Sequence, residues 1–293
     1  MREVLQQAAL ATVDEGGGQF QAGAFDELAD VVFSRADDAA QRLCYYLREL
    51  QQRGLLGGPA VHLLDLALIP RESSVAHTAT AIDTLAGRLG IAAGAWPAAI
   101  ARANQLRGDL ARLQARRGSP GAVHERLLRA ALWSDATQWI DKVTLPSTQL
   151  ERRVLLAGSM PPDDRLHRAV DATGACIVDE LHPGGPARLG PVIDETAESP
   201  AMRIARHLQR HASGPRAFID RAGQVLDRVR ASRANAVILW LTREDESPGW
   251  QLPAQTRRLR EAGIPLLVLA DTQWAADHSA LDAVTRFCTQ EVA

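Results

Sequence analysis

The sequence predicts an α/β protein whose C-terminal half is a four-stranded, parallel, doubly wound sheet. Short, continuous apolar runs alternate with amphipathic helical segments from residue 151 onward, and this alternation is typical of a parallel sheet with helices on both faces. The four runs cover residues 154–157, 175–178, 236–241 and 265–270. A flavodoxin-like or Rossmann-like sheet of this kind binds ligands in the loops that follow its strands.

The helices expected between these strands have recognisable ends. Asp163 and Asp164 can cap one helix, Gly174 closes it, and Ser199-Pro200 begins another with serine at the N-cap and proline at the first helical position. The expected helices of this half are 164–173, one starting at 199, 218–232, 251–262 and 278–290.

Residues 1–150 predict a mainly helical part with one strand, and residues 151–293 the doubly wound domain. A nine-residue apolar run ending at Pro70, residues 61–69, is the one strand expected in the first part. Glycine and proline separate the helical segments. These segments are 1–13, 24–53, 75–89, 95–116 and 120–141.

Composition and charge exclude several classes of function. A formal net charge of -2 and a pI near 6.5 give no basic stripe for a nucleic acid backbone. Lys142 is the only lysine, and its polar surroundings suit neither a phosphate-binding loop nor a Schiff base. No apolar run approaches the roughly 18 residues of a membrane helix, and the first residues lack a signal-peptide core. We therefore expect a cytoplasmic protein with neither a nucleic acid nor a membrane partner.

The strongest candidates for acid–base chemistry follow the second strand. Glu180 and His182 stand at a strand end, where a carboxylate and an imidazole can act as a general acid–base pair. The alternative is that the acids there cap loops or pair with arginine. Ser159 opens the loop after the first strand, but the Gly-x-Ser-x-Gly pattern of a nucleophile elbow is absent.

A phosphate-bearing ligand such as coenzyme A has candidate contacts in the same loops. Gly184 and Gly185 could present backbone amides, and Arg188, Arg203 and Arg206 could act as forked donors to phosphate. Ser159 and Arg243 follow strands, where the coenzyme could also contact them. The alternatives are ordinary surface arginines and, around Arg243, a solvated polar loop. Among the eight histidines, His207 and His211 are four residues apart and so share a helix face, but the pair lacks a third ligand, so no metal site is expected.

Several short motifs resemble the subunit family of 2-hydroxyacyl-CoA dehydratases and benzoyl-CoA reductases. The motifs are Arg153-Val-Leu-Leu-Ala-Gly158, Gly174-Ala-Cys-Ile-Val-Asp-Glu180, the run from Asn235 to Leu241, Glu261-Ala-Gly-Ile-Pro265, and Asn104 with Arg107. The resemblance implies paired subunits in anaerobic aromatic or 2-hydroxyacyl metabolism. In that family a four-iron cluster, held by cysteines after these strands, passes an electron to a CoA thioester.

The sequence departs from the family pattern where those cysteines would stand. The replacements are Leu181-His182, Thr242-Arg243, Phe33-Ser34-Arg35 and Pro70-Arg71. Cys44, Cys176 and Cys288 fall inside expected helices and a strand, which favours buried packing. Because cluster iron needs thiolate or imidazole ligands, we expect no cofactor bound by this chain and an iron–sulfur cluster only in a partner.

Three interpretations remain open. The first is a cluster-free, non-redox subunit that helps to form an acyl-CoA pocket and an interface with a larger, cysteine-bearing homologous subunit. The second is a non-redox CoA-thioester enzyme that uses Glu180 or His182 as acid and base. The third is a purely structural partner protein. The substrate acyl group and the identity of the partner stay undetermined.

Overall fold

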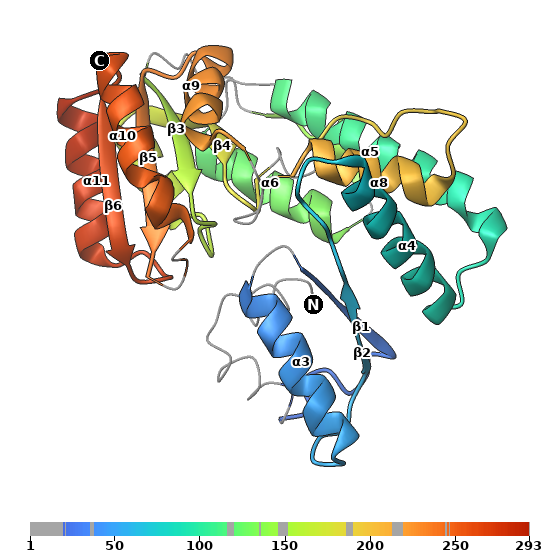
Figure 1. Ribbon diagram of the computed structural model, residues 1–293. Helices are drawn as coiled ribbons and strands as arrows, with labels where there is room; N and C mark the ends of the chain where they lie inside the picture. The colour runs from blue at the N-terminus through green and yellow to red at the C-terminus, as the bar shows by residue number, and fades with distance from the viewer. Residues whose placement is uncertain are drawn as a thin grey trace. The chain divides into compact units, whose positions relative to one another are not determined.

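The computed structural model describes residues 20–292 except 21, 36–37, 116–119, 135, 146–151, 186–189, 213–218, 244 and 246 (Figure 1). The chain forms two compact units, each taken by itself below. The first comprises the described parts of residues 1–102 and 193–218, and the second those of 103–192 and 219–293. These units are defined by compactness, whereas the predicted division at residue 150 is based on composition. The domain division at residue 150 therefore stays a prediction.

The second unit contains the expected parallel sheet. Its strands are β3 (Arg152–Gly158), β4 (Ala175–Leu181), β5 (Ala236–Thr242) and β6 (Leu266–Thr272). They pair in the order β4-β3-β5-β6, and every pair is parallel (Figure 1). The α/β fold class is therefore confirmed, with all four strands close to their predicted positions.

Helices cover both faces of this sheet because successive side chains of each strand point to opposite sides. Val154 and Leu156 pack with α7 (Arg165–Asp171) and α11 (His278–Gln290). Leu155 and Ala157 pack with α9 (Arg221–Ser232) and α10 (Leu252–Glu261). A short 3-10 helix, η5 (Ser247–Gln251), directly precedes α10. All seven residues of β5 are buried, which explains its uninterrupted apolar sequence.

A helical layer of the second unit precedes β3. Helix α5 (Trp96–Ala115) contributes Leu110 and Leu113 to a cluster with Leu128 and Ala131 of α6 (Gly121–Trp133). Helix α6 ends before the predicted helix 120–141 does. Two 3-10 turns, η2 (Ala136–Gln138) and η3 (Ile140–Lys142), follow it.

The first unit contains a strand that the sequence did not predict. The predicted helix 24–53 is wrong over its first part, where β1 (Asp30–Ser34) precedes α3 (Asp38–Gln52). Val31 and Phe33 are buried and Val32 is exposed, an alternation that favours a strand. β1 pairs in parallel with β2 (Ala60–Leu64), which is shorter than the predicted 61–69.

Two further helices pack together in the first unit. These are α4 (Glu72–Arg88) and α8 (Pro200–Arg210), whose apolar side chains form one cluster with those of Leu64 and Trp96. A single-turn 3-10 helix, η1 (Ala93–Ala95), precedes α5. The predicted helix 1–13 lies outside the described residues. Within the described part of the chain, no helix combines the length and the apolar character needed to cross a bilayer.

Candidate functional site

The order of strands reverses between β3 and β5, the position at which doubly wound sheets bind ligands. Ser159 lies there and is 2% exposed. Its hydroxyl donates to Asp245 Oδ2 at 3.1 Å and accepts from the backbone N–H of Thr242 at 3.1 Å. Both hydrogen bonds are to residues at the end of β5, so Ser159 connects the ends of β3 and β5.

The turn that carries Ser159 depends on glycine. Gly158 has φ +115°, and a Cβ atom at this position would lie 2.2 Å from the carbonyl oxygen of Trp240. The next residue donates its backbone N–H to that same oxygen at 2.7 Å. The close approach of β3 to β5 therefore requires a residue without a side chain.

Glu180 is the centre of a buried polar cluster at the end of β4. Its Oε1 lies 2.5 Å from Nε2 of His167, which comes from α7, and its Oε2 lies 2.8 Å from Nε2 of His182. Glu180 is 5% exposed, His182 4% and His167 1%. The structure thus brings the two predicted acid–base residues together and adds a second imidazole.

The hydrogen bonds of His182 indicate which of its nitrogens carries the proton. The backbone N–H of Gly184 donates to Nδ1 at 3.2 Å, so Nδ1 is the acceptor. In a neutral imidazole the proton then lies on Nε2, which donates it to Glu180. Both nitrogens are occupied within the chain, and the tight loop after β4 sets the ring's orientation.

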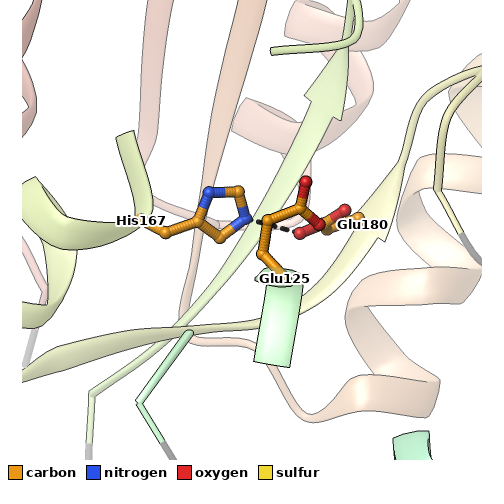
Figure 2. Close-up of side chains that lie close together, drawn as sticks. All are labelled: Glu125, His167 and Glu180. Atoms are coloured by element: carbon orange, nitrogen blue, oxygen red, sulfur yellow. Dashed lines mark hydrogen bonds and ion pairs between the residues drawn. The ribbon is translucent and has the colours of Figure 1, made fainter. Parts of the chain in front are cut away.

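Glu125 joins the cluster from α6, beside the carboxylate of Glu180 (Figure 2). Arg129, one helical turn further on, donates from Nε to Glu125 Oε1. The same guanidinium donates to the carbonyl oxygens of Pro161 at 2.7 Å and Pro162 at 2.9 Å. Arg129 therefore connects Glu125 to the segment between β3 and α7.

Burial and neighbouring charges act in opposite directions on these groups. Burial and the negative charge of Glu180 raise the pKa of Glu125. Burial also opposes ionisation of Glu180, but the adjacent His167 and His182 hold its pKa well below the usual range. Burial disfavours the charged form of His167, yet Glu180 and Glu125 raise its pKa. The cluster therefore favours an ionised Glu180 facing a protonated partner.

The same three side chains have the donor atoms of a metal site. One ligand atom from each of Glu125, His167 and Glu180 lies within 4.8 Å of the other two. Sequence reasoning missed Glu125 and His167. A signal existed for Glu125, since it shares the buried face of α6 with Ala122, Leu128 and Ala131 at intervals of three residues.

The residue before Glu180 supports the alternative of arginine pairing. Asp179 Oδ1 accepts from Arg228 at 2.5 Å and from the backbone N–H of Glu180 at 2.9 Å. Of the two adjacent acids, Asp179 thus pairs with an arginine, whereas Glu180 faces histidines.

The predicted contacts for coenzyme A are spread over several loops. The amides of Gly184 and Gly185 both donate to His182, to Nδ1 and to the carbonyl oxygen respectively. Arg243 is exposed and its Nε donates at 2.8 Å to Asp271, near the end of β6. Arg188 lies outside the described residues. The coenzyme role of this set stays a prediction.

Arg203 and Arg206 belong to the first compact unit. Arg206 binds Glu72 and Glu198, and Arg203 donates to the carbonyl oxygen of Asp194. These contacts match the alternative of ordinary surface residues, although they do not test phosphate binding.

The three cysteines lie in three different elements. Cys44 of α3, Cys176 of β4 and Cys288 of α11 are each at most 2% exposed. Burial raises the pKa of all three thiols, to about 12 for Cys176 and about 11 for Cys288. These are properties of packed, unreactive thiols.

Comparison with models of protein families gives a match that extends over most of the chain. The family model described as 2-hydroxyglutaryl-CoA dehydratase, D-component, matches residues 4–284. No curated protein matches the chain. The family match agrees with the resemblance of the strand motifs, and its extent is decisive: the chain belongs to the 2-hydroxyglutaryl-CoA dehydratase D-component family.

Proposed function

We propose that the chain is a cluster-free, non-redox subunit of a 2-hydroxyacyl-CoA dehydratase-type complex. It helps to form an acyl-CoA pocket and the interface with a larger, cysteine-bearing homologous subunit. Family membership supports the dehydratase type, and the description of the family as a component supports a partner. The single observation that carries the cluster-free role is the placement of the three cysteines.

The family's iron–sulfur cluster does not fit these residues. Such a cluster takes its ligands mainly from cysteine thiolates, usually four. The whole sequence has three cysteines, and one of them, Cys44, belongs to a different compact unit from Cys176 and Cys288. All three are buried in packed elements, where burial disfavours the thiolate form. The electron chemistry therefore belongs to the partner in this proposal.

The acid–base alternative receives less support from the geometry. A general base must come within hydrogen-bond reach of the proton that it abstracts. Glu180 and His182 are buried and bonded to each other, so neither faces solvent. The purely structural alternative differs from the proposal only in lacking a contact with the acyl-CoA.

Anaerobic co-purification from the native host tests the proposal. We expect the tagged chain to bring down a cysteine-rich homologue, and after separation of the subunits we expect iron and sulfide in that homologue alone. Stoichiometric iron in the separated chain would contradict the cluster-free role. Turnover of an acyl-CoA by the isolated chain would contradict the subunit role.

A pair of arginine variants separates the proposal from the structural alternative. Arg243→Ala removes an exposed guanidinium at the ligand edge of the sheet, whereas Arg260→Ala removes an exposed one from α10. We expect the assembled complex with Arg243→Ala to bind acyl-CoA more weakly and the Arg260→Ala complex to match the unmodified one. Equal affinity in all three complexes favours the structural partner.

A further inference from the structure

Glu125, His167 and Glu180 reach one point from three separate elements of the second compact unit. Helix α6 supplies the first, α7 the second and β4 the third, and the close-up in Figure 2 shows the two carboxylates beside the imidazole. We propose that these three side chains form a binding site for one divalent transition-metal ion. The proposal does not depend on the subunit role, and it departs from the expectation that the chain has no metal site.

The donor set has the chemistry of such a site. Two carboxylate oxygens and one imidazole nitrogen are ligands that zinc and its first-row neighbours accept, and three protein ligands leave a fourth position for water. With bonds of about 2.0–2.2 Å, two donors on a tetrahedral ion lie about 3.4 Å apart. The three donors now lie within 4.8 Å of one another, with His167 Nε2 and Glu180 Oε1 at 2.5 Å. An ion thus requires only side-chain adjustments of about 1 Å.

Charge gives the second reason. The carboxylates of Glu125 and Glu180 lie close together and are each 5% exposed, so little solvent screens their repulsion. Arg129 contacts Glu125, and histidines contact Glu180. One divalent ion offsets two carboxylate charges, and the imidazole can then bind it in the neutral form. Among the described residues Nδ1 of His167 has no hydrogen-bond partner, so the ring's polar contact lies inside the cluster, through Nε2.

The residues around the three ligands are arranged as supports for a metal site. His182 donates to Oε2 of Glu180 and is itself oriented by Gly184. Arg129 donates to Oε1 of Glu125 and is held by two proline carbonyls. A carboxylate has two oxygens, so each glutamate can keep this partner and offer the other oxygen to an ion. Outer partners of this kind orient metal ligands and tune their affinity.

Because the cluster is buried, a bound ion would act on the stability of the fold. His167 is 1% exposed and both glutamates are 5% exposed. An ion at this point would join α6 and α7 to the end of β4, and it would stabilise the folded chain because the unfolded chain holds no such arrangement. We therefore expect the metal to raise the melting temperature.

Zinc binding to the full-length chain tests the site. The purified protein is stripped of metal with a chelator and titrated with zinc chloride in a calorimeter. Thermal unfolding is then measured with and without zinc. We expect one zinc ion per chain and a higher Tm. X-ray absorption at the zinc edge should then give a shell of nitrogen and oxygen with an imidazole signature and without sulfur at about 2.3 Å. Absence of stoichiometric binding, or sulfur in the shell, overturns the proposal.

Matched variants assign the ion to these residues. Glu125→Gln and Glu180→Gln keep the side-chain size, and each should weaken zinc binding by about 100-fold or more, since loss of outer partners alone costs about 10–100-fold. Asp109→Asn is the control, because Asp109 is equally buried in the same unit and pairs with Arg112 outside the cluster. Unchanged affinity in both glutamine variants overturns the site. If those variants do not fold, the absorption spectrum of the unmodified chain decides.

Discussion

Replacing Gly158 with alanine tests the close approach of β3 and β5 on which the candidate ligand edge depends. The residue has φ +115°, a conformation that side chains rarely adopt. An added Cβ would lie 2.2 Å from the carbonyl oxygen of Trp240 and 3.0 Å from Cδ2 of Leu241. Both contacts involve β5, which is buried along its whole length and cannot move aside without disturbing both faces of the sheet.

The expected cost has two parts. The unfavourable backbone conformation costs about 1–3 kcal/mol. Relief of the clash separates the strand ends and weakens the hydrogen bond from the Ser159 N–H to Trp240, a bond worth about 0.5–1.5 kcal/mol. We therefore expect the free energy of unfolding to fall by roughly 2–4 kcal/mol.

Two other glycines of the same unit separate the parts of this cost. Gly263 has φ +68° and no described atom within 4 Å of an added Cβ, so Gly263→Ala carries the backbone cost alone, about 1–2 kcal/mol. Gly249→Ala meets neither a clash nor a positive φ and should be near neutral. Urea unfolding, monitored by circular dichroism, gives the free energy of unfolding of each of the three variants. The reasoning is refuted if Gly158→Ala is as stable as Gly249→Ala.

Two further predictions concern thiol reactivity and a helix cap. Because burial raises the pKa of Cys176 to about 12 and that of Cys288 to about 11, the unfolded state releases these protons first. Native chains should thus resist alkylation by iodoacetamide at pH 8, whereas urea-unfolded chains should be alkylated at once. The free energy of unfolding should fall as the pH rises above about 9. Rapid alkylation of the native chain, measured by mass spectrometry, would contradict this prediction. Asp171 accepts the N–H groups of Gly121 and Ala122 at the start of α6, at 2.8 and 2.9 Å. Asp171→Ala should lower the free energy of unfolding by about 0.5–2 kcal/mol and Asp171→Asn by less, and equal urea midpoints for both variants and the unmodified chain would exclude a capping role.

The sheet of the second unit could be predicted because each strand is a short apolar run bounded by breaks. Val237 and Leu239 face one side and Ile238 and Trp240 the other, and both sides are covered, so the strand needs apolar residues throughout. β1 was missed because it is half exposed and precedes a helix with a similar apolar content. The alternation at 31–33 is three residues long, too short to outweigh the helical pattern after it.

The candidate site could be predicted only in part. Glu180 and His182 lie at the end of a strand that the sequence reveals, and parallel topology places that strand end at the ligand edge. Glu125 and His167 lie on helices that the sequence also reveals, but their meeting point depends on how α6 and α7 pack against β4. No spacing along the chain encodes that packing, so a rule based on ligand spacing finds no site.

His182 connects the departure from the family pattern to the chemistry of the cluster. The resemblance implies a cluster cysteine in the stretch where Leu181 and His182 stand. Here the imidazole turns inward, with Nε2 on Glu180 and Nδ1 on the amide of Gly184, and it is 4% exposed. A cysteine side chain is too short to make both of these contacts at the present geometry. The loop after β4 thus directs its imidazole onto a buried carboxylate, and His182 is not presented to solvent.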